Sequence, residues 1–281
     1  MADSDGASPD IVLNVQDLRI RNEVTGAELV KGIGFSLRRG HTLGIVGESG
    51  SGKTLTCRAV LGILPKLIQL SDGTVDILGR RTAEFTKQDW LDSRGNVISA
   101  VFQDPGSYLN PSIWLGKQVQ EVLRVKGGLS RKEAKQETLR LFTAVHLRDP
   151  ELVYEQYVHE LSGGMLQRVL IAAAIALRPD ILIADEITTA LDVTVQAEIL
   201  DLLLELKEQE GLSLVVVSHD LAVVAQLCDE VLVMREGEVV EHGPAREVLH
   251  SPRHEYTKLL ISEHKRYGLD HFSQAKELDV V

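Results

Sequence analysis

Gly47-Glu48-Ser49-Gly50-Ser51-Gly52-Lys53-Thr54 is the stretch that decides the fold of this chain. It fits the pattern G-x-x-x-x-G-K-[ST], in which small residues let backbone amides surround the phosphates of a nucleotide. Lys53 adds charge near the β- and γ-phosphates, and the Thr54 hydroxyl is a ligand for Mg²⁺. The flanking residues predict a strand over 41–46 and a helix over 53–64, the context that a phosphate-binding loop (P-loop) requires. We therefore expect all eight residues to bind a nucleoside triphosphate.

A second glycine-rich stretch lies downstream, Leu161-Ser162-Gly163-Gly164-Met165-Leu166-Gln167-Arg168. A serine and two glycines before an apolar helix are, taken alone, typical of an ordinary helix N-cap. The same helix start also offers backbone amides and a favourable dipole to an anion. The other motifs of the chain decide between these two interpretations.

Two carboxylates follow a wholly apolar run over 181–184, namely Asp185 and Glu186. The run predicts a parallel strand buried on both faces, and ligands bind at the carboxyl end of such strands. Asp185 is suited to hold Mg²⁺ through water, and Glu186 to orient or deprotonate the water that attacks in phosphoryl transfer. Without the glycine-rich motifs, the pair would be interpreted as a helix cap.

Gln103 and His219 follow two further apolar strands, predicted over 97–102 and 214–218. The carboxamide of Gln103 can reach Mg²⁺ and the attacking water while its loop faces a partner subunit. A histidine at a strand end is usually a solvated surface residue. His219 is assigned a function only because of its order and spacing relative to the other motifs of the chain.

Taken in order, these motifs resemble those of the ATP-binding cassette (ABC) ATPases, and the resemblance covers residues 11 to about 260. It implies an α/β P-loop NTPase fold: an ABC ATPase core with a mostly parallel sheet, an N-terminal antiparallel β subdomain and an inserted helical subdomain. It also implies hydrolysis of ATP to ADP and phosphate with Mg²⁺. One P-loop and one signature per chain imply that a complete site needs two chains.

The resemblance assigns a role to each site residue. The catalytic group is Glu186, Gln103 and His219, with His219 as the switch that senses the γ-phosphate. The metal ligands are Thr54, Gln103 and Asp185. The signature, which acts in trans on the nucleotide of the other chain, is Leu161, Ser162, Gly163, Gly164 and Gln167, and the D-loop at the dimer seam includes Leu191 and Asp192.

The chain divides into a disordered N-terminus (1–10), an ABC ATPase domain (11–263) and a C-terminal tail (264–281). Within the domain, residues 104–177 are expected to form the helical subdomain, because helical patterns replace strands there. Ser130 and Glu133 predict a capping box, whose helix places Leu139, Phe142 and Val145 on one stripe. By resemblance, this subdomain carries a groove for a coupling helix of a membrane subunit.

Composition supports this interpretation and excludes others. The net charge of −11 and the lack of basic clusters argue against nucleic acid as the main ligand. The apolar segment 169–177 is far too short to span a bilayer, and no secretory signal is recognisable. Cys57 and Cys228 are the two cysteines, which offer neither a disulfide framework nor a metal cluster. We expect a protein of the reducing cytosol.

Two stretches resemble the peptide and nickel importer ATPases within the ABC family: the region around Gln103-Asp104-Pro105, and Ser251-Pro252-Arg253-His254 before Tyr256-Thr257. Leu61-Gly62-Ile63-Leu64-Pro65 and the signature look most like the nickel or metallophore branch. No cysteine follows Cys228, so the iron-sulfur segment of many peptide relatives is not expected. Import of nickel or a metal chelate is the first interpretation and import of di- or oligopeptides the alternative.

Departures from the family pattern are Ile187 and Glu255, which stand where proline is usual, and the lack of any aromatic residue between Ile11 and Gly34 to stack on adenine. The resemblance implies two integral membrane permease subunits, a second ATPase subunit (a different chain or a second copy) and, indirectly, an extracytoplasmic solute-binding protein. It places the chain peripherally on the cytoplasmic face of the inner membrane. A cytosolic, non-transporting ABC protein is the alternative from another class, but the tandem cassettes or long coiled coil of such proteins are missing.

Overall fold

The computed structural model describes residues 10–189 and 191–266 of the 281-residue chain. The described residues form two compact units, the first from 10–85 and 213–266 and the second from 86–212. The predicted disordered N-terminus and C-terminal tail lie almost entirely outside the described residues. The predicted domain boundaries therefore stay predictions.

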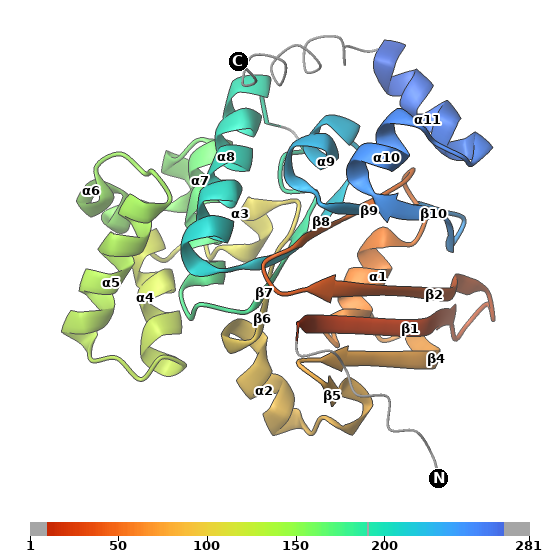
Figure 1. Cartoon of the computed structure of the whole chain (residues 1–281). Coiled ribbons are helices and arrows are strands. Elements are labelled where there is room, and N and C mark those ends of the chain that lie inside the picture. Colours follow the sequence, from red (N-terminus) through yellow and green to blue (C-terminus); the bar gives the residue numbers. More distant parts are fainter. Residues whose placement is uncertain (1–9, 190, 267–281) are drawn as a thin grey trace. The chain divides into compact units, whose positions relative to one another are not determined.

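The first unit contains an antiparallel sheet of order β2-β1-β4-β5, whose strands lie side by side in Figure 1. Alternation of apolar and polar residues explains the long strand β1, in which Leu13, Val15, Leu18 and Ile20 are buried. The pairing register of β1 and β2 shifts between Val15 and Leu18, around Asp17 with its φ of 45°. The strands are β1 (Ile11–Asn22), β2 (Glu28–Arg38), β4 (Ile68–Ile77) and β5 (Arg80–Arg81).

A second group of strands in the first unit has the order β10-β9-β3-β8. β3 pairs in parallel with both β8 and β9, whereas β10 returns antiparallel to β9 through a turn at Glu236 and Gly237, both at positive φ. Every residue of β3 and β8 is buried, as their continuous apolar sequences predict. These strands are β3 (Thr42–Val46), β8 (Ser213–Ser218), β9 (Glu230–Arg235) and β10 (Glu238–Pro244).

The helices of the first unit are α1 (Lys53–Val60), η1 (Thr82–Glu84), α9 (Leu221–Leu227), α10 (Ala245–His250) and α11 (Glu255–Arg266). Helix α1 ends earlier than predicted, because Leu61 is its C-cap and Gly62 follows with a φ of 63°. Helices α9, α10 and α11 pack with β9 around one apolar cluster that includes Val224, Val231, Val248 and Leu260.

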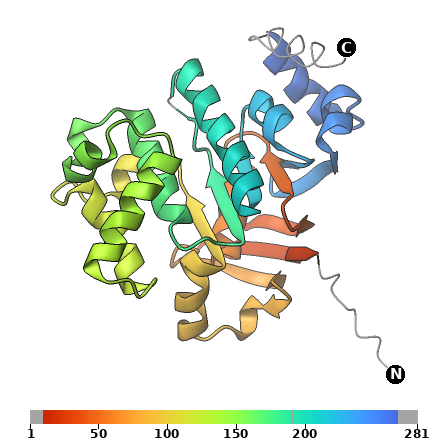
Figure 2. The ribbon, with the colours of Figure 1, turned by 60° about the vertical axis from the view of Figure 1, so that its left-hand side comes forward.

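The second unit combines two parallel strands with helices, of which those of residues 115–175, coloured yellow-green to green, lie together in Figure 2. The capping box of Ser130 and Glu133 is confirmed at the start of α5, but the predicted stripe is partly wrong: Leu139 is half-buried, whereas Leu141 is buried. The strands are β6 (Ile98–Val101) and β7 (Ile181–Asp185). The helices are α2 (Lys87–Asn96), α3 (Pro105–Tyr108), α4 (Leu115–Val125), α5 (Arg131–Ala144), α6 (Pro150–Glu155), η2 (Val158–Glu160), α7 (Gly163–Ile175) and α8 (Val193–Glu210).

Candidate nucleotide-binding site

The P-loop connects the end of β3 to the start of α1, as the sequence predicts. Gly47, Gly50 and Gly52 have φ values of 149°, 83° and 103°, a region that residues with a Cβ rarely adopt. A Cβ on Gly47 would also lie 2.1 Å from the carbonyl oxygen of Met234. The glycines of the motif are therefore required by the shape of the loop.

Two polar side chains are buried inside this loop. Lys53 is 4% exposed, and its Nζ donates to the carbonyl oxygens of Gly47 (2.7 Å) and Glu48 (2.8 Å). Ser51 is also 4% exposed, and among the described residues its hydroxyl has no hydrogen-bond partner. A buried hydroxyl without a partner costs free energy. A loop with a buried ammonium group and an unsatisfied hydroxyl is chemically suited to an anionic ligand such as a triphosphate.

His219 leaves the same edge of the sheet as the P-loop. β3 and β8 are parallel, and Val46 is the register partner of Ser218, so Gly47 and His219 follow neighbouring strand ends. The His219 side chain is exposed. Asp220 follows it and caps α9 by accepting a hydrogen bond from the amide of Ala222 at 2.8 Å. His219 therefore lies between a rigid strand and a capped helix.

Gln103, Asp185 and Glu186 are brought together in the second unit. β6 and β7 are parallel, with Val101 opposite Ala184, so the residues that follow both strands leave the same edge. Asp185 is buried, Glu186 is half-buried and Gln103 is exposed. Two carboxylates and a carboxamide thus follow neighbouring strands at one edge, and their catalytic and metal-binding roles stay predictions.

Glu186 adopts an unusual backbone conformation, with a φ of 52°. Positive φ is uncommon for residues other than glycine, and it turns the chain sharply after β7. Thr189 closes the turn through its amide, which donates to the Glu186 carbonyl oxygen at 3.1 Å. Ile187, which stands where the family usually has proline, is buried. The turn is thus held by an apolar side chain and a hydrogen bond in place of a proline ring.

The signature motif opens helix α7. Ser162 is the N-cap, and its Oγ accepts a hydrogen bond from the amide of Met165 at 3.4 Å. Ser162 and Gly163 are exposed, Leu161 is half-buried and Gly164 is buried. The N-cap interpretation is therefore correct, and the exposed Ser162 and Gly163 also leave the helix start open to solvent, where an anion is favoured.

Gln167 lies one helical turn after Gly163 in α7. It is 1% exposed, and its Nε2 is a buried donor with no partner among the described residues. Its action in trans stays a prediction.

Arg168 is a residue whose importance the sequence analysis missed. Its guanidinium is almost completely buried and donates to the Val145 carbonyl oxygen at 2.9 Å and to the Glu198 carboxylate at 2.7 Å. It therefore joins α7 to the end of α5 and to α8. The signal was available, because an arginine within an otherwise apolar helix needs partners.

The D-loop residues precede α8. Asp192 is the N-cap of this helix, and its Oδ1 accepts from the amide of Val195 at 3.0 Å. Leu191 is half-buried and contributes to the packing near Gly163, since a Cβ on Gly163 would lie 3.6 Å from Leu191 Cδ2. The preceding residue, Ala190, lies outside the described residues.

The donors predicted to bind Mg²⁺ belong to both units: Thr54 to the first, Asp185 and Gln103 to the second. All three offer oxygen, the ligand atom that Mg²⁺ prefers. In the described part of the chain, no group of three histidine, cysteine or acidic side chains could hold a metal ion. The donor chemistry fits a metal that is held by one carboxylate together with nucleotide phosphates.

Asn22 ends β1, within the stretch 11–34 that has no aromatic residue. Its Oδ1 accepts from the amides of Val24 (2.9 Å) and Thr25 (3.1 Å), so it closes the turn between β1 and β2. The start of β2 passes close to the P-loop, because a Cβ on Gly52 would lie 3.1 Å from Val30 Cγ2 and 3.3 Å from the Leu29 carbonyl oxygen. Residues 11–34 contain no aromatic side chain that could stack on the base, and Phe35, further along β2, is buried.

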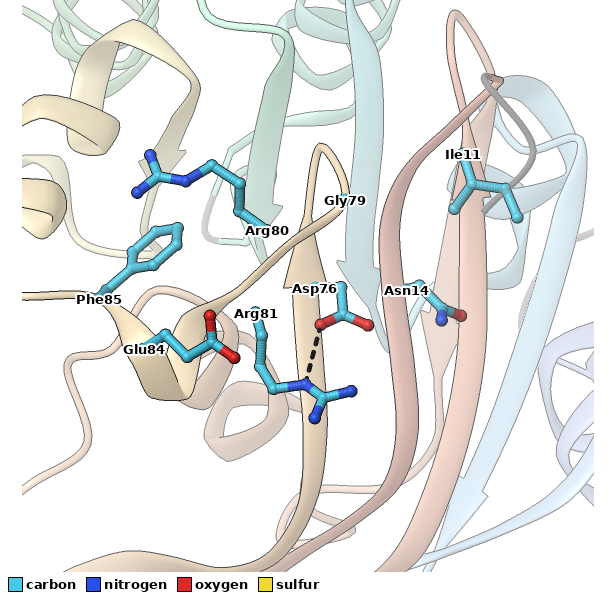
Figure 3. Close-up of a pocket in the computed structure, with 8 residues that line it drawn as sticks. All are labelled: Ile11, Asn14, Asp76, Gly79, Arg80, Arg81, Glu84 and Phe85. Atoms are coloured by element: carbon cyan, nitrogen blue, oxygen red, sulfur yellow. Dashed lines mark ion pairs between the residues drawn. The ribbon is translucent and has the colours of Figure 1, made fainter. Parts of the chain in front are cut away.

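A hollow of about 590 Å³ lies elsewhere in the first unit, lined by residues of β1, β4, β5 and η1. Figure 3 draws the side chains that line it. Its arginines are engaged: Arg81 Nε lies 3.6 Å from Asp76 Oδ1, and the Arg80 guanidinium lies 4.8 Å from the centre of the Phe85 ring. No residue of the P-loop lines it. The chemistry suited to a triphosphate is found at the P-loop and not in this hollow.

None of the helices in the described ranges combines the length and apolar character needed to cross a membrane.

Comparison with known proteins gives a match to the ABC transporter family over residues 30–189. The chain is 44% identical over 255 residues to the oligopeptide transport ATP-binding protein OppD of Escherichia coli, a match that covers 90% of this chain and 75% of OppD. It is 37% identical over 269 residues to the metal-staphylopine import system ATP-binding protein CntD of Staphylococcus aureus, covering 96% and 98%.

Among solved structures, the chain is similar to the ATP-binding cassette MJ0796, seen as a dimer in a post-hydrolysis state bound to ADP and Pi. The TM-score is 0.73 at 26% identity, and the match covers 83% of this chain and 99% of the cassette. The predicted fold class, with its parallel strands and its antiparallel β subdomain, is therefore confirmed.

Proposed function

This chain belongs to the ABC transporter family of ATPases, and we propose that it is the subunit that energises a binding-protein-dependent importer. The observation that carries the proposal is the P-loop, with Lys53 buried against the loop carbonyls and the Ser51 hydroxyl unsatisfied. Both groups gain partners when phosphate oxygens enter the loop. ATP is the ligand that this chemistry and the family favour.

In the proposed reaction, Glu186 orients or deprotonates the water that attacks the γ-phosphate, and Gln103 holds the same water. The amides of Gly47 to Thr54 and the ammonium of Lys53 neutralise phosphate charge, which is the main contribution of the protein in phosphoryl transfer. His219, next to the P-loop at the sheet edge, senses the γ-phosphate. Ser162 and Gly163 complete the site of a second chain in trans.

Mg²⁺ is the proposed metal, held by Thr54, Gln103 and Asp185. When bound, it neutralises charge on the β- and γ-phosphates. Asp185 ends β7 and carries carboxylate oxygens, the ligand atoms that Mg²⁺ prefers, which supports this role.

The proposed partners are two integral membrane permease subunits and a second ATPase, either a different chain or a second copy of this one. A solute-binding protein outside the cytoplasm acts through the permease. The chain then lies peripherally on the cytoplasmic face of the inner membrane. The exposed side chains of Tyr108 and Ile113, which follow Gln103, are available to a permease helix.

For the solute, we propose nickel or a metal chelate. The resemblance over 61–65 and in the signature supports it, as does the similarity to CntD along 96% of this chain. Di- or oligopeptides are the second candidate, which the 44% identity to OppD favours. The ATPase does not touch the solute, so the test must include the binding protein.

The test uses proteoliposomes that contain the permease, both ATPases and ATP inside. Phosphate release is measured with the binding protein empty, loaded with Ni²⁺ chelate, or offered di- and tripeptides. We expect stimulation by the metal-loaded form, and no stimulation in the matched complex with Glu186→Gln and an inactivated partner ATPase. Stimulation only by the binding protein that was offered peptides would show that the solute is a peptide and not a metal chelate. Phosphate release unaffected by any loaded binding protein would contradict the importer role.

A further inference from the structure

The C-terminal helix α11 contacts the P-loop through the hydroxyl of Tyr256. The backbone amide of Glu48 donates to this hydroxyl at 3.1 Å, across a separation of 208 residues. Tyr256 is 3% exposed. Tyr256 belongs to the stretch from Ser251 to Thr257 that resembles the peptide and nickel importer ATPases, and it has no role among the catalytic residues assigned above.

The Tyr256 ring is held from several sides. It packs in one apolar cluster with Val46, the residue immediately before the P-loop, and with Val233 and Leu260. The guanidinium of Arg235, at the end of β9, lies 4.9 Å from the ring centre. The hydroxyl is therefore presented to the P-loop by a ring that has little freedom to move.

The chain before α11 is also fixed. The Glu241 carboxylate of β10 accepts hydrogen bonds from the amides of Arg253 (2.8 Å) and His254 (3.1 Å). The amide of Tyr256 in turn donates to His254 Nδ1 at 3.1 Å. Burial raises the pKa of the Tyr256 hydroxyl, so this group keeps its proton near neutral pH and still has a lone pair for the Glu48 amide.

Both backbone polar groups of Glu48, its carbonyl oxygen and its amide, form hydrogen bonds to side chains. Its carbonyl oxygen accepts from Lys53 Nζ at 2.8 Å, and its amide donates to Tyr256. The Lys53 ammonium has three N–H donors and gives two hydrogen bonds to the carbonyls of Gly47 and Glu48, so it must turn at least one donor toward the β- and γ-phosphates of a nucleotide. The hydrogen bond to Tyr256 does not compete with phosphate, so it can hold this part of the loop while Lys53 moves.

We propose that Tyr256 is a positioning residue for ATP, which keeps the start of the P-loop in its phosphate-binding shape and couples helix α11 to nucleotide affinity. This inference rests on the proposed role of the P-loop in binding ATP. It gives the C-terminal stretch a mechanical connection to the nucleotide site. Any change that displaces α11 would then weaken ATP binding without touching a catalytic group.

The test variant is Tyr256→Phe in the full chain, which keeps the ring, its apolar cluster and its contact with Arg235 but removes the acceptor. Calorimetry measures the Kd of a non-hydrolysable ATP analogue with Mg²⁺. We expect Kd to rise about 3- to 10-fold, the range that the net loss of one hydrogen bond gives. In the assembled ATPase, KM for ATP should rise by the same factor while kcat stays unchanged. Hydrogen exchange at the Glu48 amide should become faster.

Tyr154→Phe is the matched control, because Tyr154 is equally buried and loses a 2.8 Å hydrogen bond to Gln120 in the other unit. For Tyr154→Phe we expect a loss of thermal stability comparable to that of Tyr256→Phe, but a Kd equal to that of the wild type. An unchanged Kd in Tyr256→Phe, or an equal rise in both variants, would overturn the inference. If the wild type failed to bind the analogue at all, the proposed function would fall, and this inference with it.

Discussion

Replacing Gly164 by alanine tests whether the signature helix has room for a side chain within its own chain. Gly164 is buried near the start of α7, and a Cβ there would lie 2.4 Å from Cγ1 of Val195 in α8. Carbon atoms in contact normally lie about 3.5 to 4.0 Å apart, so the overlap exceeds about 1 Å. The substitution must displace either Val195 or a helix.

The cost follows from the stiffness of the neighbour. Valine in a helix has one strongly preferred χ1 rotamer, so the methyl group cannot simply swing away. Overpacking of this kind costs about 1 to 3 kcal/mol. Each kcal/mol lowers Tm by about 2 to 4 °C in a protein of this size, so we expect a loss of about 2 to 12 °C.

Gly163→Ala is the matched control, because a Cβ there meets Leu191 Cδ2 at 3.6 Å, an ordinary contact. Thermal unfolding of the two single variants and of Gly164→Ala/Val195→Ala, which removes both methyl groups of the neighbour, is the assay. We expect Gly163→Ala to keep the wild-type Tm and the double variant to recover much of the loss. A wild-type Tm for Gly164→Ala, or no recovery in the double variant, would refute the packing argument.

Three further outcomes are expected. Lys53→Ala should weaken ATP binding itself in a calorimetric titration, because a charge aimed at the β- and γ-phosphates is lost; wild-type affinity would contradict this. Ser162→Arg should leave ATP binding to the isolated chain unchanged but block phosphate release in the assembled dimer, and an equal loss of affinity in the monomer would exclude a role in trans. GTP should compete well with ATP, because the stacking contribution of roughly 1 to 3 kcal/mol is absent beside Asn22; strong ATP preference in a competition assay would contradict it.

The strands and the motifs that follow them could be predicted because each depends on local sequence. The apolar runs of β3, β7 and β8 predict buried parallel strands, and in such strands the polar residues that follow collect at one edge. The end of α1 was predicted four residues too late, although the sequence contains its signal: Gly62 supplies the left-handed residue that terminates a helix.

Contacts between distant segments could not be predicted in this way. The burial of Gln167 depends on the helices that pack on α7, which the spacing of the signature does not show. The stripe on α5 was misassigned because Leu139 and Leu141 lie on different faces, and only the neighbouring helices decide which face is covered. The contact of Tyr256 with Glu48 joins residues 208 positions apart, and no local pattern indicates it.

The most direct test of the account is turnover by the assembled ATPase with Glu186→Gln in this chain and the partner ATPase inactivated. The substitution removes the base but leaves the P-loop intact, so we expect ATP to bind with wild-type affinity while phosphate release falls by roughly 10² to 10⁴-fold. Phosphate release close to that of the wild type would contradict the assignment of Glu186 and, with it, the proposed mechanism of ATP hydrolysis.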